Sequence, residues 1–169
     1  MNRLPSKILR ALACTAALLP LFALPAHADG KIEVKYVDPV NFTDAGWGPV
    51  EREHNLKTLS DYFQTWAARL PGGETLKLDV LDVKLAGTVH HRAIGDIRVI
   101  NGRANWPTMK LRYTLLDGDR VLKSKTVELA DMGYLFGALP ATSADGSLPY
   151  EKRMLDDWFS HHIAPRPQP

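Results

Sequence analysis

Two adjacent aspartates, Asp156 and Asp157, have the clearest potential for acid–base chemistry in this chain. They fall in a segment with the periodicity of a helix, where aspartate is unfavourable because its short side chain competes with the backbone for hydrogen bonds. Lys152 and Arg153 precede them by four residues, but basic before acidic is the weaker order for an ion pair along a helix. Local helix physics therefore explains the two aspartates poorly.

Two explanations of this pair stay open. In the structural one, an arginine from elsewhere in the fold, such as Arg98 or Arg112, holds one aspartate in an ion pair. In the chemical one, the pair shares a cleft with a loop carboxylate, Asp131 or Asp96, and the acids hydrolyse a substrate. Carboxylate pairs of that kind work at separations of roughly 5–9.5 Å, so the hydrolase hypothesis requires at least two of these acids in one cleft.

The histidines form two adjacent pairs, His90–His91 and His161–His162. Neighbouring side chains point to opposite faces of a strand and about 100° apart on a helix, so neither pair can chelate a metal as a unit. Asp157 and His161 could share a helix face, but a third ligand is missing, and the helix dipole also explains a histidine at a helix C-terminus. We therefore predict no metal site and no cofactor.

Nucleophilic catalysis has little support. The chain has no G-x-S-x-G motif, and Ser60 and Ser124 fall in predicted regular structure. Ser143 and Ser147 lie in a loop without a recognisable base. Residues 71–77 resemble a phosphate-binding loop only superficially, because the G-K-[ST] ending is missing and a strand follows.

Trp47, between Gly46 and Gly48, is the tryptophan that we most expect to be exposed. An exposed tryptophan in a loop can stack on a sugar, a peptide or a partner protein. Large aromatic side chains are usually mostly buried, so folding back onto the sheet edge is the alternative. Trp66 and Trp158 fall on helix stripes and are predicted to be core.

Hydrophobic periodicity predicts the first half of the fold. Residues 31–37 alternate as a strand, and apolar residues at spacings of three and four predict a helix from Pro49 to Leu70. Residues 75–85 predict a second strand. Its apolar residues change parity at Val80–Leu81, which predicts a β-bulge there.

The second half is predicted to contain a short strand at 96–100, a hairpin of 108–116 with 120–129 turning at Asp117–Gly118, and a helix from Pro149 to about His162. The order is β-α-β-(β)-β-β-α. It predicts an α+β fold: a mainly antiparallel sheet of four to five strands with two helices packed on one face.

Residues 1–28 have the pattern of a cleaved signal peptide: three positive charges, an apolar run and the small residues Ala26 and Ala28. The run is too short for a membrane anchor and Cys14 lies too early for lipid attachment, so we expect export to the periplasm, cleavage after Ala28 and no membrane anchor thereafter. A single α+β domain at 29–163 and a proline-rich, disordered tail at 164–169 would remain.

Cleavage would remove the only cysteine and three of the 21 basic residues but none of the 19 acidic ones, leaving 18 basic against 19 acidic. The mature domain would then have no disulfide and no electrostatic preference for nucleic acid.

Several short strings occur together and in a fixed order along the mature chain: Val37-Asp38-Pro39, Asn41-Phe42-Thr43-Asp44, Asp96-Ile97-Arg98-Val99, Trp106-Pro107, Leu111-Arg112-Tyr113, Asp131-Met132 with Tyr134, and residues 150–159. With these strings the chain resembles the domain-of-unknown-function 3016 family of proteobacterial exported proteins. The resemblance implies a periplasmic protein and supplies no activity.

The leading hypothesis is a non-enzymatic periplasmic binding or accessory protein, which binds an envelope protein or a small ligand. The alternative is a periplasmic hydrolase that uses carboxylates of the C-terminal helix and a nearby loop. The candidate functional residues are Trp47, Asp96, Arg98, Asp131, Asp156 and Asp157.

Overall fold

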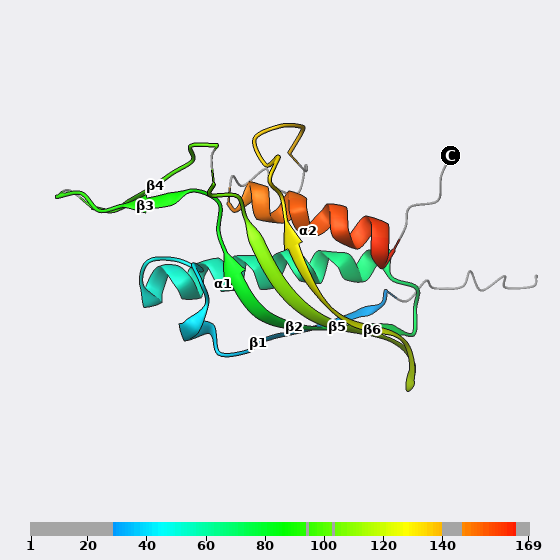
Figure 1. Cartoon of the computed structure of the whole chain (residues 1–169). Helices are drawn as coiled ribbons and strands as arrows, with labels where there is room; N and C mark the ends of the chain where they lie inside the picture. The colour runs from blue at the N-terminus through cyan, green and yellow to red at the C-terminus, as the bar shows by residue number, and fades with distance from the viewer. Residues whose placement is uncertain (1–28, 94, 103, 140–146, 165–169) are drawn as a thin grey trace, which may run out of the picture.

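The computed structural model describes residues 29–93, 95–102, 104–139 and 147–164 (Figure 1). The predicted signal peptide, the loop serine Ser143 and residues 165–169 of the predicted tail lie outside these ranges. Ala164, the first residue of that predicted tail, packs against the core, and its N–H donates to the carbonyl of Phe159.

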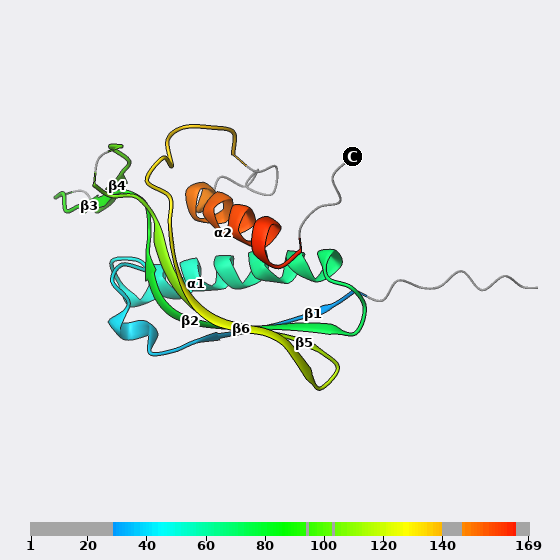
Figure 2. The same ribbon diagram turned by 45° about the vertical axis from the view of Figure 1, so that its right-hand side comes forward.

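The main sheet has four strands in the order β1-β2-β5-β6: β1 (Lys31–Tyr36), β2 (Glu74–Lys84), β5 (Thr108–Asp117) and β6 (Arg120–Ala130). The helices α1 (Pro49–Gln64) and α2 (Pro149–His162) both cover its concave face (Figure 2). The sheet is mainly antiparallel, and the predicted α+β fold is confirmed. Only β1 pairs in parallel, with β2, and α1 is the crossover between them.

Buried apolar side chains from both helices fill the space above the sheet. Trp66 and Trp158 are core residues, as predicted, with 1% and 5% of their surfaces exposed. The first helix is shorter than its apolar stripe indicated. It ends at Gln64 and continues as a 3-10 turn over Thr65–Arg69. Tightening of the last turn is common at helix ends, and it still buries Leu70.

The predicted bulge is present, because the pairing of β2 with β5 shifts between Val80 and Asp82. The predicted hairpin turn was wrong by one residue. Asp117 still pairs with Arg120 in the ladder, and the turn consists of Gly118, with φ of 57°, and Asp119. The glycine takes the positive-φ position that the turn requires.

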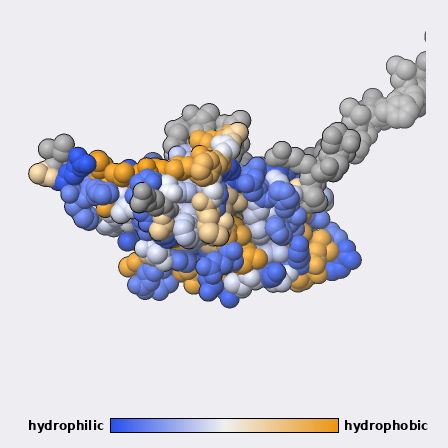
Figure 3. Space-filling model, turned by 45° about the horizontal axis from the view of Figure 1, so that its top comes forward, coloured by the Kyte–Doolittle hydropathy of each residue, from blue (hydrophilic) through white to orange (hydrophobic). Residues whose placement is uncertain are grey.

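The long strands β2 and β5 continue beyond the sheet as a narrow two-stranded arm, visible at the left of Figure 1. The arm consists of β3 (Thr88–His90) and β4 (Ile97–Val99), which pair antiparallel. The strand predicted at 96–100 corresponds to β4, whereas its partner β3 had no clear pattern in the sequence. Apolar surface gathers along this arm (Figure 3), where Ile97 and Ile100 are exposed.

No helix in the described ranges is long and apolar enough to cross a membrane.

Candidate functional site

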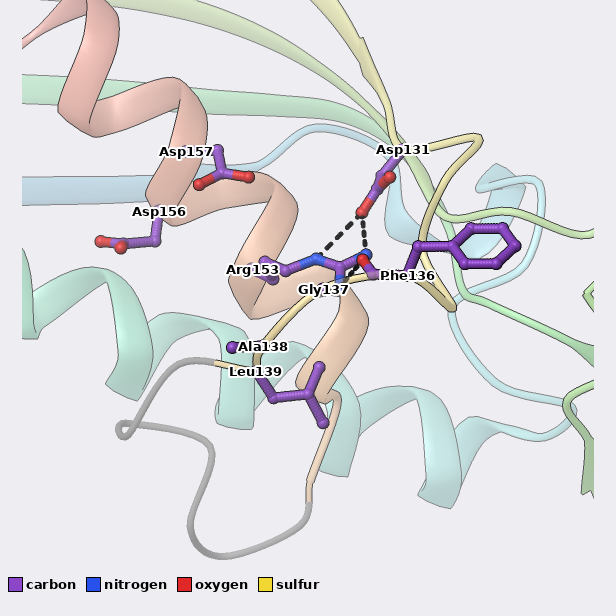
Figure 4. A pocket seen from close by; sticks show the side chains of 8 residues that line it. All are labelled: Asp131, Phe136, Gly137, Ala138, Leu139, Arg153, Asp156 and Asp157. Atoms are coloured by element: carbon purple, nitrogen blue, oxygen red, sulfur yellow. Dashed lines mark hydrogen bonds and ion pairs between the residues drawn. The ribbon is translucent and has the colours of Figure 1, made fainter.

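The six candidate residues lie in two separate places. Trp47, Asp96 and Arg98 lie along the β3–β4 arm, where Trp47 contacts His91 and Asp96 lies just beyond the distal end of the ladder. The remaining three, Asp131, Asp156 and Asp157, line one pocket beside α2 (Figure 4). The aspartates of the last helix therefore share a pocket with Asp131, and Asp96 belongs to the other group.

The loop before α1 holds Trp47 in an outward position. Gly46 has φ of 131°, and a Cβ there would lie 2.8 Å from the backbone nitrogen of Arg52, so the chain crosses the first turn of α1 where only glycine fits. The N–H of Trp47 donates to the carboxylate of Glu51 at 2.8 Å, an interaction typical of a helix start. The Trp47 side chain is 60% exposed.

The Trp47 ring makes an edge-on contact with the ring of His91, with centroids 5.8 Å apart. Nδ1 of His91 in turn lies within hydrogen-bond distance of Oδ1 of Asp96, at 2.9 Å. The arm therefore supports the tryptophan from one side. The alternative in which Trp47 folds back onto the sheet edge is not what the structure shows.

An ion pair joins the Trp47 loop to the arm. Both oxygens of Asp44 accept hydrogen bonds from the guanidinium of Arg98 at 2.8 Å. The backbone of Asp44 is also bonded to β2, through Val83 and Leu85. Next to it, both the N–H and the hydroxyl of Thr43 donate to Asp82 at 2.7 Å. Asp82 follows the bulge, so the bulge aims this carboxylate at the loop.

A second carboxylate ties the same region to α2. Glu151 is 2% exposed, and its Oε1 accepts a hydrogen bond from the N–H of Ala86 at 2.6 Å. The carbonyl of Ala86 accepts from Arg98 at 3.4 Å. Burial raises the pKa of Glu151, and the Ala86 bond and the charge of Arg98 offset part of that rise. Asp44, Arg98, Ala86 and Glu151 thus connect the Trp47 loop, the arm and α2.

A pocket of about 410 Å³ opens between the loop and the arm, and we call it the Trp47 pocket. Its lining includes Trp47, Asp44, Arg52, Lys84 and Asn105. Asp44 is neutralised by Arg98. Among the residues that the structure describes, neither Arg52 nor Lys84 has a carboxylate partner; the Lys84 ammonium lies over the Trp106 ring, 5.7 Å from its centroid. The pocket therefore presents two cationic side chains without a direct carboxylate partner beside an exposed aromatic ring.

The second pocket has a volume of about 460 Å³ and contains an arginine that holds a loop (Figure 4). Arg153 is 8% exposed and donates two hydrogen bonds to Oδ2 of Asp131, at 2.6 and 3.2 Å. It also donates to the carbonyls of Phe136, at 2.8 Å, and Gly133, at 3.4 Å. The loop after β6 is therefore fixed to α2, although Phe136 itself is 83% exposed.

The aspartates of α2 have a different arginine from the two that we expected. Arg98 binds Asp44 and Arg112 binds Asp79, whereas Asp156 pairs with Arg69. Arg69 also donates to the hydroxyl of Ser160 at 2.7 Å and lies over the Phe159 ring. A tertiary arginine does hold the aspartate, but it comes from the 3-10 turn that ends the first helical segment.

The two C-terminal histidines bond to their own helix. Nδ1 of His161 lies 2.6 Å from the carbonyl oxygen of Asp157, and Nδ1 of His162 lies 3.0 Å from that of Trp158. Basic side chains commonly satisfy the last carbonyls of a helix in this way. No group of three or more His, Cys, Asp or Glu side chains that could hold a metal occurs in the described part of the chain.

Residues 30–161 match the model of a family described as a protein of unknown function, DUF3016. The chain belongs to this family. No curated protein and no solved structure matches it. The DUF3016 match spans both pockets, so every residue that lines them is part of the family region.

Sequence reasoning missed four residues of these sites. Asp44 and Glu151 carry the buried connections around the arm, and both stand in the strings by which the chain resembles the DUF3016 family. Their place in these strings was the one feature of the sequence that could have identified them. Arg52 and Lys84 lie in a helix and a strand with unremarkable patterns, and only the fold brings them to the same pocket.

Proposed function

We propose that this DUF3016 protein is a non-enzymatic binding protein of the bacterial envelope, exported to the periplasm, and that it binds a small ligand in the Trp47 pocket. The observation that carries the proposal is the position of Trp47. Its ring is 60% exposed, yet its backbone is held by Glu51 and its edge by His91. A large aromatic surface that is kept in water but held in one orientation is suited to stacking on a ligand.

The charges around the pocket support a ligand rather than a closed structural feature. Arg52 and Lys84 line it without a carboxylate partner among the described residues, so an anionic group could supply the missing charge. Asn105 and Thr88 add polar atoms to the same wall. Small-ligand sites commonly combine one apolar surface with a few placed polar groups.

The test is native mass spectrometry of the protein, purified from the periplasm without detergent. We expect a bound small molecule that is lost in Trp47→Ala and retained in Phe136→Ala, which removes an even more exposed ring outside the Trp47 pocket. Both variants should unfold within about 0.5 kcal/mol of the wild type, because both side chains lie at the surface. Retention of the ligand in Trp47→Ala would contradict the proposal.

Mild crosslinking in the periplasm distinguishes binding of a small ligand from binding of a protein partner. A protein recovered in near-equal amounts with the wild type, and lost with Trp47→Ala, would show that the exposed ring docks a partner and would overturn the small-ligand proposal. A large loss of stability in Trp47→Ala would show that the ring is structural.

One observation favours the hydrolase alternative, namely the single pocket that Asp131, Asp156 and Asp157 share. Two of these carboxylates already accept hydrogen bonds from Arg153 and Arg69, which suits them to holding the fold rather than moving a proton. Asp157 is the exposed member. A hydrolytic activity lost in Asp157→Asn and retained in Trp47→Ala would support the hydrolase and contradict the binding proposal.

A further inference from the structure

An apolar groove adjoins the Trp47 pocket on the other side of the first turn of α1. It has a volume of about 640 Å³, and its lining includes the carbon surfaces of Tyr36, Pro39, Val40, Pro49 and Leu56. We call it the α1 groove. Val40 is 69% exposed, so the groove leaves apolar surface in water. Such surface is favourable to cover.

The wall of the α1 groove is held in place by hydrogen bonds between residues of its own lining. The hydroxyl of Tyr36 donates to the carbonyl of Leu56 at 2.7 Å and lies 3.0 Å from the hydroxyl of Ser60. Burial raises the pKa of Tyr36 to about 12, so this hydroxyl keeps its proton at any physiological pH. The tyrosine ring therefore presents a fixed, uncharged face to the groove.

Arg52 joins the two cavities, because it lines both the α1 groove and the Trp47 pocket. In the described ranges its guanidinium has no hydrogen-bond or ion-pair partner. Among the other charged residues of the groove lining, Lys57 pairs with Asp61 at 2.6 Å, and Glu53 carries a negative charge. Arg52 and Lys84 are the two cationic side chains of the Trp47 pocket that have no carboxylate partner among the described residues, and most of the groove surface beyond Arg52 is apolar.

We propose that the ligand of the Trp47 pocket is an anionic amphiphile with a single hydrocarbon chain, whose headgroup binds between Arg52 and Lys84 and whose chain lies in the α1 groove. This inference rests on the proposed function and assigns its ligand class. A carboxylate or phosphate head provides the acceptor oxygens that a guanidinium fork recognises. Burial of the hydrocarbon chain covers Val40 and its neighbours.

The apolar groove favours this ligand class over a charged sugar or a free anion. Either of those could stack on Trp47 or bind Arg52, but neither would gain from an apolar channel. The length of the hydrocarbon chain is therefore the variable that tests the inference. Each methylene that enters the groove should tighten binding by up to about fourfold.

The experiment measures binding of octanoate, decanoate and dodecanoate to the full chain by calorimetry, below the concentration at which each forms micelles. Dodecyl phosphate tests the second headgroup, dodecyl maltoside is the uncharged control, and acetate and inorganic phosphate test the head alone. Vesicles of phosphatidylglycerol test a membrane surface. We expect affinity to rise with chain length, and the maltoside and both short anions to bind at least about tenfold more weakly than dodecanoate.

Two variants address the two ends of the ligand. Arg52→Gln should weaken dodecanoate binding at least about tenfold and leave dodecyl maltoside unchanged. Val40→Asp places a charge at the groove and should flatten the dependence on chain length. Val121→Asp, at an exposed valine of β6 outside both cavities, is the matched control and should bind like the wild type.

An affinity that does not depend on the length of the hydrocarbon chain would overturn the proposal that the ligand is an amphiphile. If acetate, phosphate or a sugar acid then binds in a way that Trp47→Ala abolishes, the proposed function stands and only the ligand class is wrong. Binding to vesicles without binding to monomeric dodecanoate would likewise overturn it, in favour of a membrane surface. Absence of binding by every probe, together with no bound species in the native spectrum, would overturn both proposals.

Discussion

Arg98 and Asp44, which are 54 residues apart in the chain, form a two-pronged ion pair with both nitrogen–oxygen distances at 2.8 Å. Their side chains are 18% and 27% exposed, so the pair is largely shielded from water. It fastens the loop that carries Trp47 to β4 of the β3–β4 arm. A change in either residue should therefore affect both the stability of the fold and the shape of the pocket.

Asp44→Asn should lower the free energy of unfolding by about 1–3 kcal/mol, because it leaves the Arg98 guanidinium without its counter-charge. Urea unfolding measures the change. Asp79→Asn is the matched control, since it breaks the Arg112 pair, whose side chains are 54% and 34% exposed. An exposed pair contributes about 0–1 kcal/mol. Equal losses in the two variants would show that the shielding of Asp44 has no consequence.

Glu151 should make stability depend on pH. Because burial raises its pKa above 4.5, the folded protein keeps a proton that the unfolded chain releases, and the free energy of unfolding falls as pH rises through that interval. In Glu151→Gln this dependence is absent, while the amide oxygen can still accept from Ala86. We expect the variant to gain stability relative to the wild type as the pH rises above 4.5, the ordinary pKa of a glutamate.

Urea titrations across this range measure the Glu151 effect. Glu128→Gln, at an exposed position of β6, provides the control and should show no such trend. A difference between Glu151→Gln and the wild type that stays constant with pH would contradict the raised pKa.

Arg153→Lys should release the loop after β6. One ammonium cannot replace the guanidinium fork that reaches Asp131 and the carbonyls of Gly133 and Phe136, and a cost of about 1–3 kcal/mol is expected. Hydrogen exchange should accelerate at the N–H groups of Tyr134 and Phe136, which are bonded within the loop. The same change at the exposed Arg112 should leave exchange in this loop as it is.

Gly46→Ala should destabilise the Trp47 loop. The backbone has φ of 131° there, and the new methyl group would lie 2.8 Å from the nitrogen of Arg52. Strain of this kind costs about 1–3 kcal/mol. Gly48→Ala is the control, because nothing lies within 4 Å of its Cβ position and its backbone is extended. Similar unfolding energies for both variants would mean that the loop can rearrange around the methyl group.

The elements that periodicity defines could be predicted from the sequence. Pro149 and the apolar spacing after it predict α2, and the change of parity at Val80–Leu81 predicts the bulge, because both are local patterns of side-chain burial. The arm strand β3 has only three residues and no alternation to read. The parallel pairing of β1 depends on which strand it meets after a long crossover, and no local pattern encodes that.

The candidate sites were predicted less completely, for a related reason. Asp156 and Asp157 stand out because aspartate is unfavourable within a helix, and the structure does provide a tertiary partner for Asp156. The identity of that partner, Arg69, depends on how a 3-10 turn packs beside α2. Likewise, Trp47 is conspicuous between two glycines, but the approach of Arg52 and Lys84 to it is a product of the assembled fold.

The parallel pairing of β1 also bears on the order in which the molecule folds. The β5–β6 hairpin closes across a two-residue turn, whereas β1 must find β2 after the whole of α1 has intervened. Contacts between distant segments form more slowly because the chain loses more entropy in closing the longer loop. We therefore expect β1, and with it the loop from β1 to α1, to dock late. The Trp47 pocket would then be completed only at the end of folding, so a partly folded molecule would lack it.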